Sequence, residues 1–125
     1  MMAKLYKTSG GNGDNSASGA QLLVDHLDIA ESFRTRAKGL LGRKALHANE
    51  ALWIKPCNNI HTFFMKFAID CIFVDNKMEI KNLVQNVTPF RFVGPFWKSH
   101  SVIETPSGFI ESKKLKIGDH LYVVS

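Results

Sequence analysis

The chain has 125 residues, of which 45% are hydrophobic and 22% are charged. This length and composition fit one globular domain with a sufficient core and exclude a second one. Sixteen Lys and Arg against 11 Asp and Glu give a formal net charge of +5, which favours anionic partners only weakly because the basic residues are scattered.

The first 20 residues are predicted to form a flexible tail. Residues 9–20 are mostly Gly, Asn, Ser and Ala, which bury too little apolar surface to offset the entropy of ordering them. The start lacks the apolar run of a signal peptide, and no later run reaches the ~18 residues of a membrane helix. We therefore expect a cytoplasmic protein, or a periplasmic or secreted one if a leader has been removed. Residues 21–125 are expected to form the single domain.

After the tail, short apolar runs alternate with turn residues. Residues 22–29 are predicted to form a strand, and Ser32 is predicted to cap a short helix that ends at Gly39 and Gly42. Further strands are predicted at 51–54, 60–65, 69–75, 78–87, 101–105 and 120–124, with turns at 75–77, 106–108 and 118–119. This pattern predicts a mainly β, single-domain antiparallel sandwich or barrel-like fold with one or two short helices.

Five segments in this order resemble a known family: RTRAKGLLGRKAL (34–46), EALWI (50–54), IHTFFMKFAIDCIFVD (60–75), SVIETPSG (101–108) and KIGDHLYV (116–123). Together they resemble the bacterial and archaeal family called domain of unknown function 192, over roughly residues 22–125. The resemblance implies a compact β-rich domain and no particular reaction. Family members often have Trp and Asn where this chain has Phe64 and Phe67, so a role that needs either residue is not expected to carry over.

His61 and Asp70 are the polar residues of one otherwise apolar run. If 60–65 and 69–75 pair as a hairpin, Phe64 faces Asp70 and His61 lies on the opposite face, although a slip of one residue would reverse this. A buried carboxylate needs hydrogen-bond donors. We expect Asp70 to be held by loop amides or by an arginine (Arg34, Arg36 or Arg43), and His61 to be a hydrogen-bonded wall residue.

Cys57, His61 and Cys71 are residue types that bind metals. Their spacing matches no zinc pattern and a fourth ligand is not evident, so we expect neither a metal nor another cofactor. Both thiols are expected to remain reduced and to pack against their neighbours. Only Cys57, in a loop four residues from His61, could act as a nucleophile, because Cys71 is predicted to lie in the middle of a strand.

The stretch PFRFVGPFW, residues 89–97, contains four aromatic residues. Such a loop either folds over an open end of the core, which we expect, or presents flat faces to a ligand. The dispersed charge argues against a groove for single-stranded nucleic acid. The basic residues between 34 and 44 are expected to be solvated, with an anion held near Arg43 as the alternative.

We interpret the chain as a small non-enzymatic binding module for a small ligand or a protein segment, with a weak preference for anions. The candidate ligand-binding residues are Arg43, His61, Phe63, Met65, Asp70, Arg91, Phe92 and Trp97. Neither nucleic acid nor membrane is expected as a partner, and the protein is expected to be a monomer. One alternative is a hydrolase-like enzyme that uses His61 with Asp70 or with Cys57. Another is a structural partner in a larger assembly, which would present a flat apolar patch.

Overall fold

The computed structural model describes residues 3–8 and 20–125. In this part of the chain the elements are β1 (Ala3–Lys7), β2 (Gln21–Ala30), α1 (Phe33–Lys38), β3 (Glu50–Ile54), β4 (Ile60–His61), β5 (Ile69–Val74), β6 (Ile80–Val87), β7 (Phe92–Val93), β8 (Ser101–Pro106), α2 (Phe109–Ser112) and β9 (Leu121–Val124). The predicted class, mainly β with two short helices, is confirmed. No helix among the described residues is long and apolar enough to cross a membrane.

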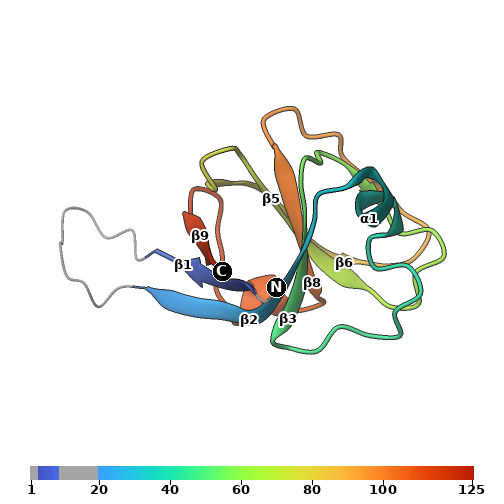
Figure 1. Cartoon of the computed structure of the whole chain (residues 1–125), viewed down its shortest axis with the longest axis horizontal. Coiled ribbons are helices and arrows are strands. Elements are labelled where there is room, and N and C mark those ends of the chain that lie inside the picture. The colour runs from blue at the N-terminus through green and yellow to red at the C-terminus, as the bar shows by residue number, and fades with distance from the viewer. Residues whose placement is uncertain (1–2, 9–19) are drawn as a thin grey trace.

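Seven of the strands form one sheet in the order β6-β5-β8-β3-β2-β1-β9, while β4 and β7 pair separately. The large sheet curls into a half-barrel (Figure 1), which is the barrel-like form of the prediction. Its neighbouring strands run antiparallel except β2 and β3, which run parallel. A parallel pair needs a crossover connection, and the segment that contains α1 provides it.

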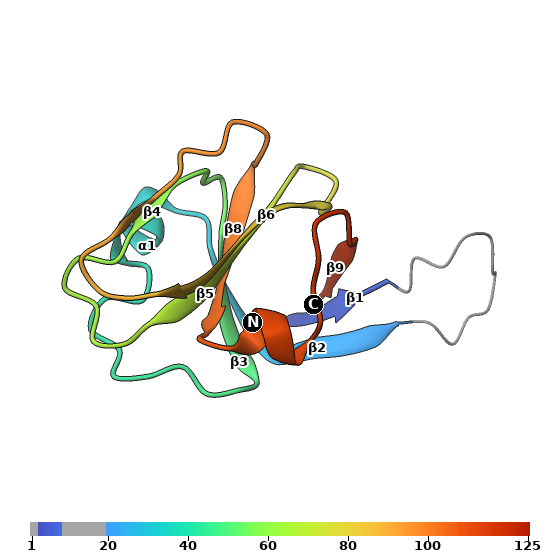
Figure 2. The ribbon, with the colours of Figure 1, turned by 180° about the vertical axis from the view of Figure 1, so that it is seen from behind.

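Two ends of the molecule can be distinguished in both views. Figures 1 and 2 show α1 beside the β4 region at one end of the sheet, with β1 and β9 at the other. The predicted flexible tail is wrong for Ala3–Lys7, because this segment forms β1 between β2 and β9. Ala3 and Leu5 are buried, so this short segment has the inward alternation of a strand ahead of the Gly- and Ser-rich stretch. The rest of the predicted tail, residues 1–2 and 9–19, lies outside the described residues.

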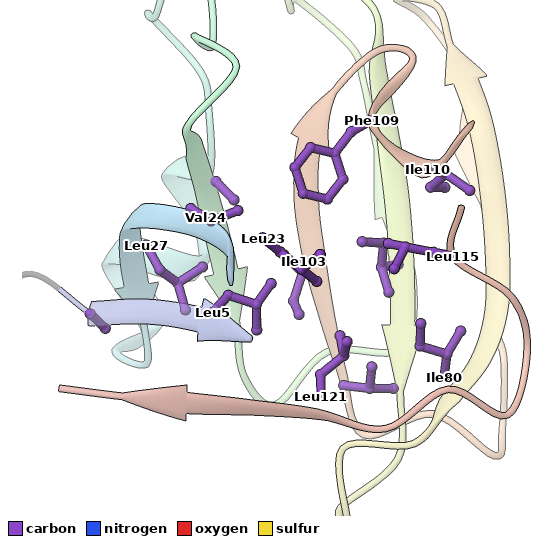
Figure 3. Packing of buried hydrophobic residues seen from close by; sticks show 14 residues of the cluster. Leu5, Leu23, Val24, Leu27, Ile80, Ile103, Phe109, Ile110, Leu115 and Leu121 are labelled. Carbon is purple, nitrogen blue, oxygen red and sulfur yellow. The ribbon is translucent and has the colours of Figure 1, made fainter. Parts of the chain in front are cut away.

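The central strands β3, β5 and β8 are covered on both faces. Ile72 and Ile103 point to one face, where they meet residues of β1, β2, β9 and α2 (Figure 3); we call it the α2 face. Phe73 and Val102 point to the other, where they meet Leu40 and the β4 region; we call it the α1 face. Because β5 is buried on both sides, its sequence IDCIFV is almost continuously apolar instead of alternating.

The predicted strand 60–65 is wrong beyond His61, and the hairpin considered for it with 69–75 is not formed. β4 contains only Ile60 and His61, which pair with Val93 and Phe92 of β7. β5 instead pairs with β6 and β8. The chain leaves β4 after His61, and Phe64, with a left-handed φ of 65°, could not belong to a continuous strand.

Candidate functional site

A cleft of about 590 Å³ opens between α1 and the α1 face of the sheet. Its apolar lining includes Leu40, Ile54, Ile60 and Met65. A volume of this size suits a small molecule, because ligand sites are typically concave and mostly apolar with a few polar groups.

Helix α1 forms one side of the cleft and is fixed at both ends. The Ser32 hydroxyl accepts a hydrogen bond from the Thr35 amide (3.1 Å), and the Thr35 hydroxyl accepts one from the Ser32 amide (3.1 Å). At the other end Gly39 has a φ of 49°, and its amide donates to the Thr35 carbonyl (3.0 Å). The predicted cap and end of this helix are confirmed. None of its six described residues is buried, because the helix borders a cleft and not the core.

Glu104 reaches the cleft from β8. It pairs with Leu52 and Cys71 on the neighbouring strands and is only 4% exposed. Burial raises the pKa of its carboxyl to about 7, against a partial opposing effect of the Arg43 charge. The Arg43 guanidinium is itself paired with Asp28, with 2.9 Å between Nη2 and Oδ2. Glu104 is therefore shared between its acid and carboxylate forms near neutral pH.

Three polar atoms around this cleft are buried and have no hydrogen-bond partner within the described part of the chain. They are Arg36 Nε, Ser99 Oγ and Glu104 Oε2. All three residues line the cleft. Arg36 is held in place by its Nη1, which donates to the Pro56 carbonyl (3.2 Å). Buried polar groups nearly always have a hydrogen-bond partner. Three such atoms without one at a single cleft therefore mark a place where a polar partner fits.

The two cysteines have different surroundings. Cys57 lines the cleft, its Sγ donates to the Asn59 carbonyl (2.9 Å), and burial raises its pKa. Cys71 is fully buried in β5, and burial raises its pKa well above the ordinary value. Neither thiol therefore holds much thiolate near neutrality, which disfavours both as nucleophiles. Across residues 3–8 and 20–125, no three His, Cys, Asp or Glu side chains are grouped as a metal ion requires.

Asp70 lies on the α2 face, away from the cleft. It is fully buried, and its Oδ1 and Oδ2 accept hydrogen bonds from the backbone amides of Asn86 (2.8 Å) and Ile110 (3.0 Å). The expectation that backbone amides hold Asp70 is confirmed, but the amides belong to β6 and α2 and not to loops. None of the hydrogen bonds to its carboxylate in the described residues comes from an arginine or from His61, so the hypothetical His61–Asp70 dyad is not formed.

The other predicted site residues lie in several places. His61 and Met65 line the cleft. Phe63 and Phe92 lie beside His61 in a cluster of aromatic rings, with centroid distances of 5.4 and 6.4 Å to its imidazole. Arg43, as described above, is paired with Asp28.

The expectation that the loop 89–97 covers the core is wrong for most of its aromatic residues. Phe90, Phe92 and Trp97 are 64%, 77% and 83% exposed, and Arg91 between the first two is exposed as well. Only Phe96 packs inward, with its ring centroid 4.7 Å from that of Phe73. Gly94 permits the loop to approach the cleft wall, because a Cβ there would lie 2.7 Å from the Asn58 carbonyl oxygen.

Sequence reasoning missed Glu104, Arg36 and Ser99 as members of one site. The signal for Glu104 was present, because SVIET places a single carboxylate inside an apolar strand run just as Asp70 is placed in β5. Ser99 and Arg36 carry no comparable signal, since a serine in a loop and an arginine on a short helix are ordinary surface residues.

Several proteins are similar to this chain. A UPF0127 protein of Pyrococcus horikoshii is 36% identical over 98 residues, which are 74% of this chain and 83% of that protein. A UPF0127 protein of Pyrococcus furiosus is 29% identical over 112 residues, covering 86% of this chain and 93% of its own length.

Two crystal structures share the fold. A protein of unknown function from Novosphingobium aromaticivorans superposes with a TM-score of 0.77 at 20% identity and covers 95% of this chain and 83% of its own. A candidate transcription regulator from Sinorhizobium meliloti has a TM-score of 0.80 at 16% identity, with coverages of 98% and 94%. At these identities the likeness shows the fold alone. The model of the DUF192 family, described as an uncharacterized ACR, matches residues 15–123. The chain therefore belongs to the DUF192 family, whose function is uncharacterised.

Proposed function

We propose that the chain is a small-molecule-binding domain whose ligand occupies the cleft beside α1. The observation that carries this proposal is the convergence of Arg36 Nε, Ser99 Oγ and Glu104 Oε2, all buried and unpartnered in the described structure, on one cleft. Leaving a buried polar group without a partner costs about 1–3 kcal/mol. A bound polar molecule that pairs with these atoms removes that cost, which makes it the expected occupant.

The lining residues support one kind of ligand. Apolar side chains such as Leu40 and Met65 favour an apolar body, and the three unpartnered atoms favour a polar head. Arg36 Nε can only donate a hydrogen bond, whereas Glu104 can donate or accept because its pKa is about 7. Arg36 and Lys38 on the cleft side fit the weak preference for anionic ligands. The ligand we propose is a small amphipathic molecule whose head carries at least one acceptor oxygen.

The test is a binding screen by amide chemical-shift mapping with carboxylic-acid, amide and amine fragments. Binders are expected to shift the amides of residues 36–41, 54–61 and 99–104. Glu104→Gln, which keeps the size of the side chain, is expected to change affinity about 10-fold by altering the hydrogen bonds to the head group. Glu111→Gln, on the exposed surface of α2, is the matched control and should leave affinity unchanged. Shifts on another face, or equal affinity for both variants, would contradict the proposal.

Catalysis in the same cleft is the second candidate, and it also rests on Glu104. A carboxyl with a pKa of about 7 in a cleft can work as a general acid or base, and His61 is a second titratable group in the lining. Time-resolved NMR of the fragments that bind separates the two functions. Conversion of a fragment by the wild type, lost in Glu104→Gln while binding persists, would show an enzyme. Binding without conversion supports the binding domain.

A further inference from the structure

A connected cluster of aromatic rings projects beside the mouth of the cleft. We call the rings of His61, Phe63, Phe64, Phe90 and Phe92 the aromatic surface. Phe63 joins them, with centroid distances of 4.7 Å to Phe92, 6.0 Å to Phe90 and 5.4 Å to His61, and Phe64 lies 6.2 Å from Phe90. Phe64, Phe90 and Phe92 are 77%, 64% and 77% exposed. Contiguous exposed apolar side chains of this kind mark interaction surfaces.

One buried hydroxyl holds the two loops that carry this surface. Thr62 Oγ1 donates to the Thr88 carbonyl (2.6 Å) and accepts from the Arg91 amide (2.9 Å). The Thr62 carbonyl also accepts from the Phe90 amide (3.1 Å). Thr62 is fully buried, so these bonds are protected from water. The aromatic rings are therefore positioned before any partner arrives.

Two of the exposed rings are held by unfavourable backbone. Phe64 and Phe90 have φ values of 65° and 66°, in the left-handed region that bulky residues rarely adopt. Backbone held in such conformations concentrates at functional sites, where the surrounding contacts maintain it. Here the backbone directs two phenylalanine rings into solvent, where they add little burial of apolar surface to the stability of the fold.

The two segments that carry these rings have charges of one sign only. Segments 60–68 and 88–99 contain Lys66, Arg91 and Lys98 and no Asp or Glu. We propose that the aromatic surface docks the protein on membranes that contain anionic lipids, with the phenylalanine rings at the level of the head groups and Arg91 and Lys66 against their phosphates. Aromatic side chains are favoured in this interfacial zone, and nearby basic residues add attraction to anionic lipid.

The ring geometry favours a lipid surface over single-stranded nucleic acid. The Phe63 and Phe92 planes cross at 87° and the Phe64 and Phe90 planes at 69°, so the rings form an uneven ridge and not parallel platforms on which successive bases stack. A fluid interface adapts to such a ridge. The proposal departs from the expectation of no membrane partner, which was made from the sequence without this exposed aromatic surface. It is also independent of the ligand in the cleft.

The test is co-sedimentation with vesicles of phosphatidylcholine alone and of phosphatidylcholine mixed with phosphatidylglycerol. We expect partitioning about 10-fold stronger on the mixed vesicles at low salt, weakened by added salt because the Debye length shortens. The double variant Phe64→Ser with Phe92→Ser should lower partitioning at least ~10-fold, and Arg91→Ala should lower it less. Vesicles should broaden the wild-type amide signals of residues 61–66 and 88–93, a readout that needs no variant.

Two control variants distinguish binding through the aromatic surface from non-specific hydrophobic binding and from binding in the cleft. Ile117→Ser changes another exposed hydrophobic residue, 64% exposed between α2 and β9, and should partition like the wild type. Glu104→Gln should do the same, so failure of the cleft proposal would leave this one standing. Equal binding to both vesicle types, or full binding by the double variant, overturns the proposal. So does the finding that the wild type instead binds single-stranded nucleic acid or self-associates through these rings.

Discussion

Each face of the central sheet buries one carboxylate, and the two faces treat it differently. On the α2 face, Asp70 accepts hydrogen bonds from two backbone amides. On the α1 face, Glu104 has one oxygen without a partner among the described residues and borders an open cleft. The two residues lie on paired strands, one register position apart, since Asp70 pairs with Thr105 and Cys71 with Glu104. Both carboxylates are therefore buried. They differ in their hydrogen-bond donors, because Asp70 has two and one oxygen of Glu104 has none among the described residues.

The helices explain this difference. α2 packs Phe109 and Ile110 into the core, which brings the Ile110 amide, a free donor at the start of a helix, onto Asp70. α1 buries none of its six described residues and stands across the cleft from Glu104. Helix α2 thus covers the α2 face and donates a hydrogen bond to Asp70, whereas α1 leaves a cleft beside Glu104 on the α1 face.

The largest predicted effect tests the closed face. Asp70→Ala removes a fully buried carboxylate and leaves two backbone amides without their acceptor, one of them in a fully buried hydrogen bond. We therefore expect a loss of about 4 kcal/mol in the free energy of unfolding, measured by urea denaturation. Asp28→Ala is the matched control, because its carboxylate is exposed and pairs with Arg43 at the surface; it should lose less than ~1 kcal/mol. If the two variants were equally stable, Asp70 would not hold the α2 face.

The open face should respond to pH in the opposite sense to a paired carboxylate. The folded-state pKa of Glu104 is raised to about 7 from its ordinary value of 4.5, so between these values the folded state keeps a proton that the unfolded state releases. Its contribution to stability is complete below pH 4.5 and is lost as the pH rises to 7, by roughly 3 kcal/mol in total.

Glu104→Gln removes this titration. The variant should therefore gain stability relative to the wild type as the pH rises through that window, which urea denaturation at several pH values measures. Taking the difference between the two proteins cancels every other titrating group. A difference that stays constant with pH would mean that Glu104 is not buried as an unpaired acid.

The loops that carry the aromatic surface, at the edge of the α1 face, are held together by the Thr62 hydroxyl. Thr62→Val keeps the shape of the side chain and removes its bonds to Thr88 and Arg91, so we expect a loss of about 1–2 kcal/mol and weaker protection of the Phe90 and Arg91 amides in hydrogen exchange. Thr88→Val, at an exposed position of the same loop, is the control. Unchanged protection would show that the loop is held by other contacts.

The smallest predicted effect concerns the cysteines. Cys57, beside the cleft, should react slowly with a thiol reagent near neutral pH because burial raises its pKa, and Cys71 should react only after unfolding. The Glu104 charge also raises the pKa of Cys57, so Glu104→Gln should speed the reaction at Cys57. The reaction rate is followed by mass spectrometry. No change in rate would place the Glu104 charge too far from the thiol.

Local signals in the sequence predicted most of the fold. Runs of branched and aromatic residues located β2, β3, β5, β6, β8 and β9, and Ser32 and Gly39 located α1. β1 was missed because a five-residue strand gives little periodic signal and precedes a Gly- and Ser-rich stretch. The β4–β7 pairing was missed because two-residue strands pair across a long separation in the chain.

The candidate site was predicted only in part, for a physical reason. His61 and Met65 were among the predicted binding residues and both line the cleft, although the strand predicted to carry them ends at His61. The missing partner of Glu104 depends on which face α1 leaves uncovered, and that is set by tertiary packing and not by any local pattern. An aspartate and a glutamate in similar apolar runs look alike in the sequence, and only the surrounding donors separate them.

The most direct test of this account is a carbon-13 NMR titration of the Glu104 side-chain carboxyl in the folded protein. An unpaired, buried carboxyl at the cleft predicts a midpoint of about 7, and a ligand bound in the cleft should move it. A midpoint at its ordinary value of 4.5 would contradict the account, because Glu104 would then be solvated or paired and the α1 face would be as satisfied as the α2 face.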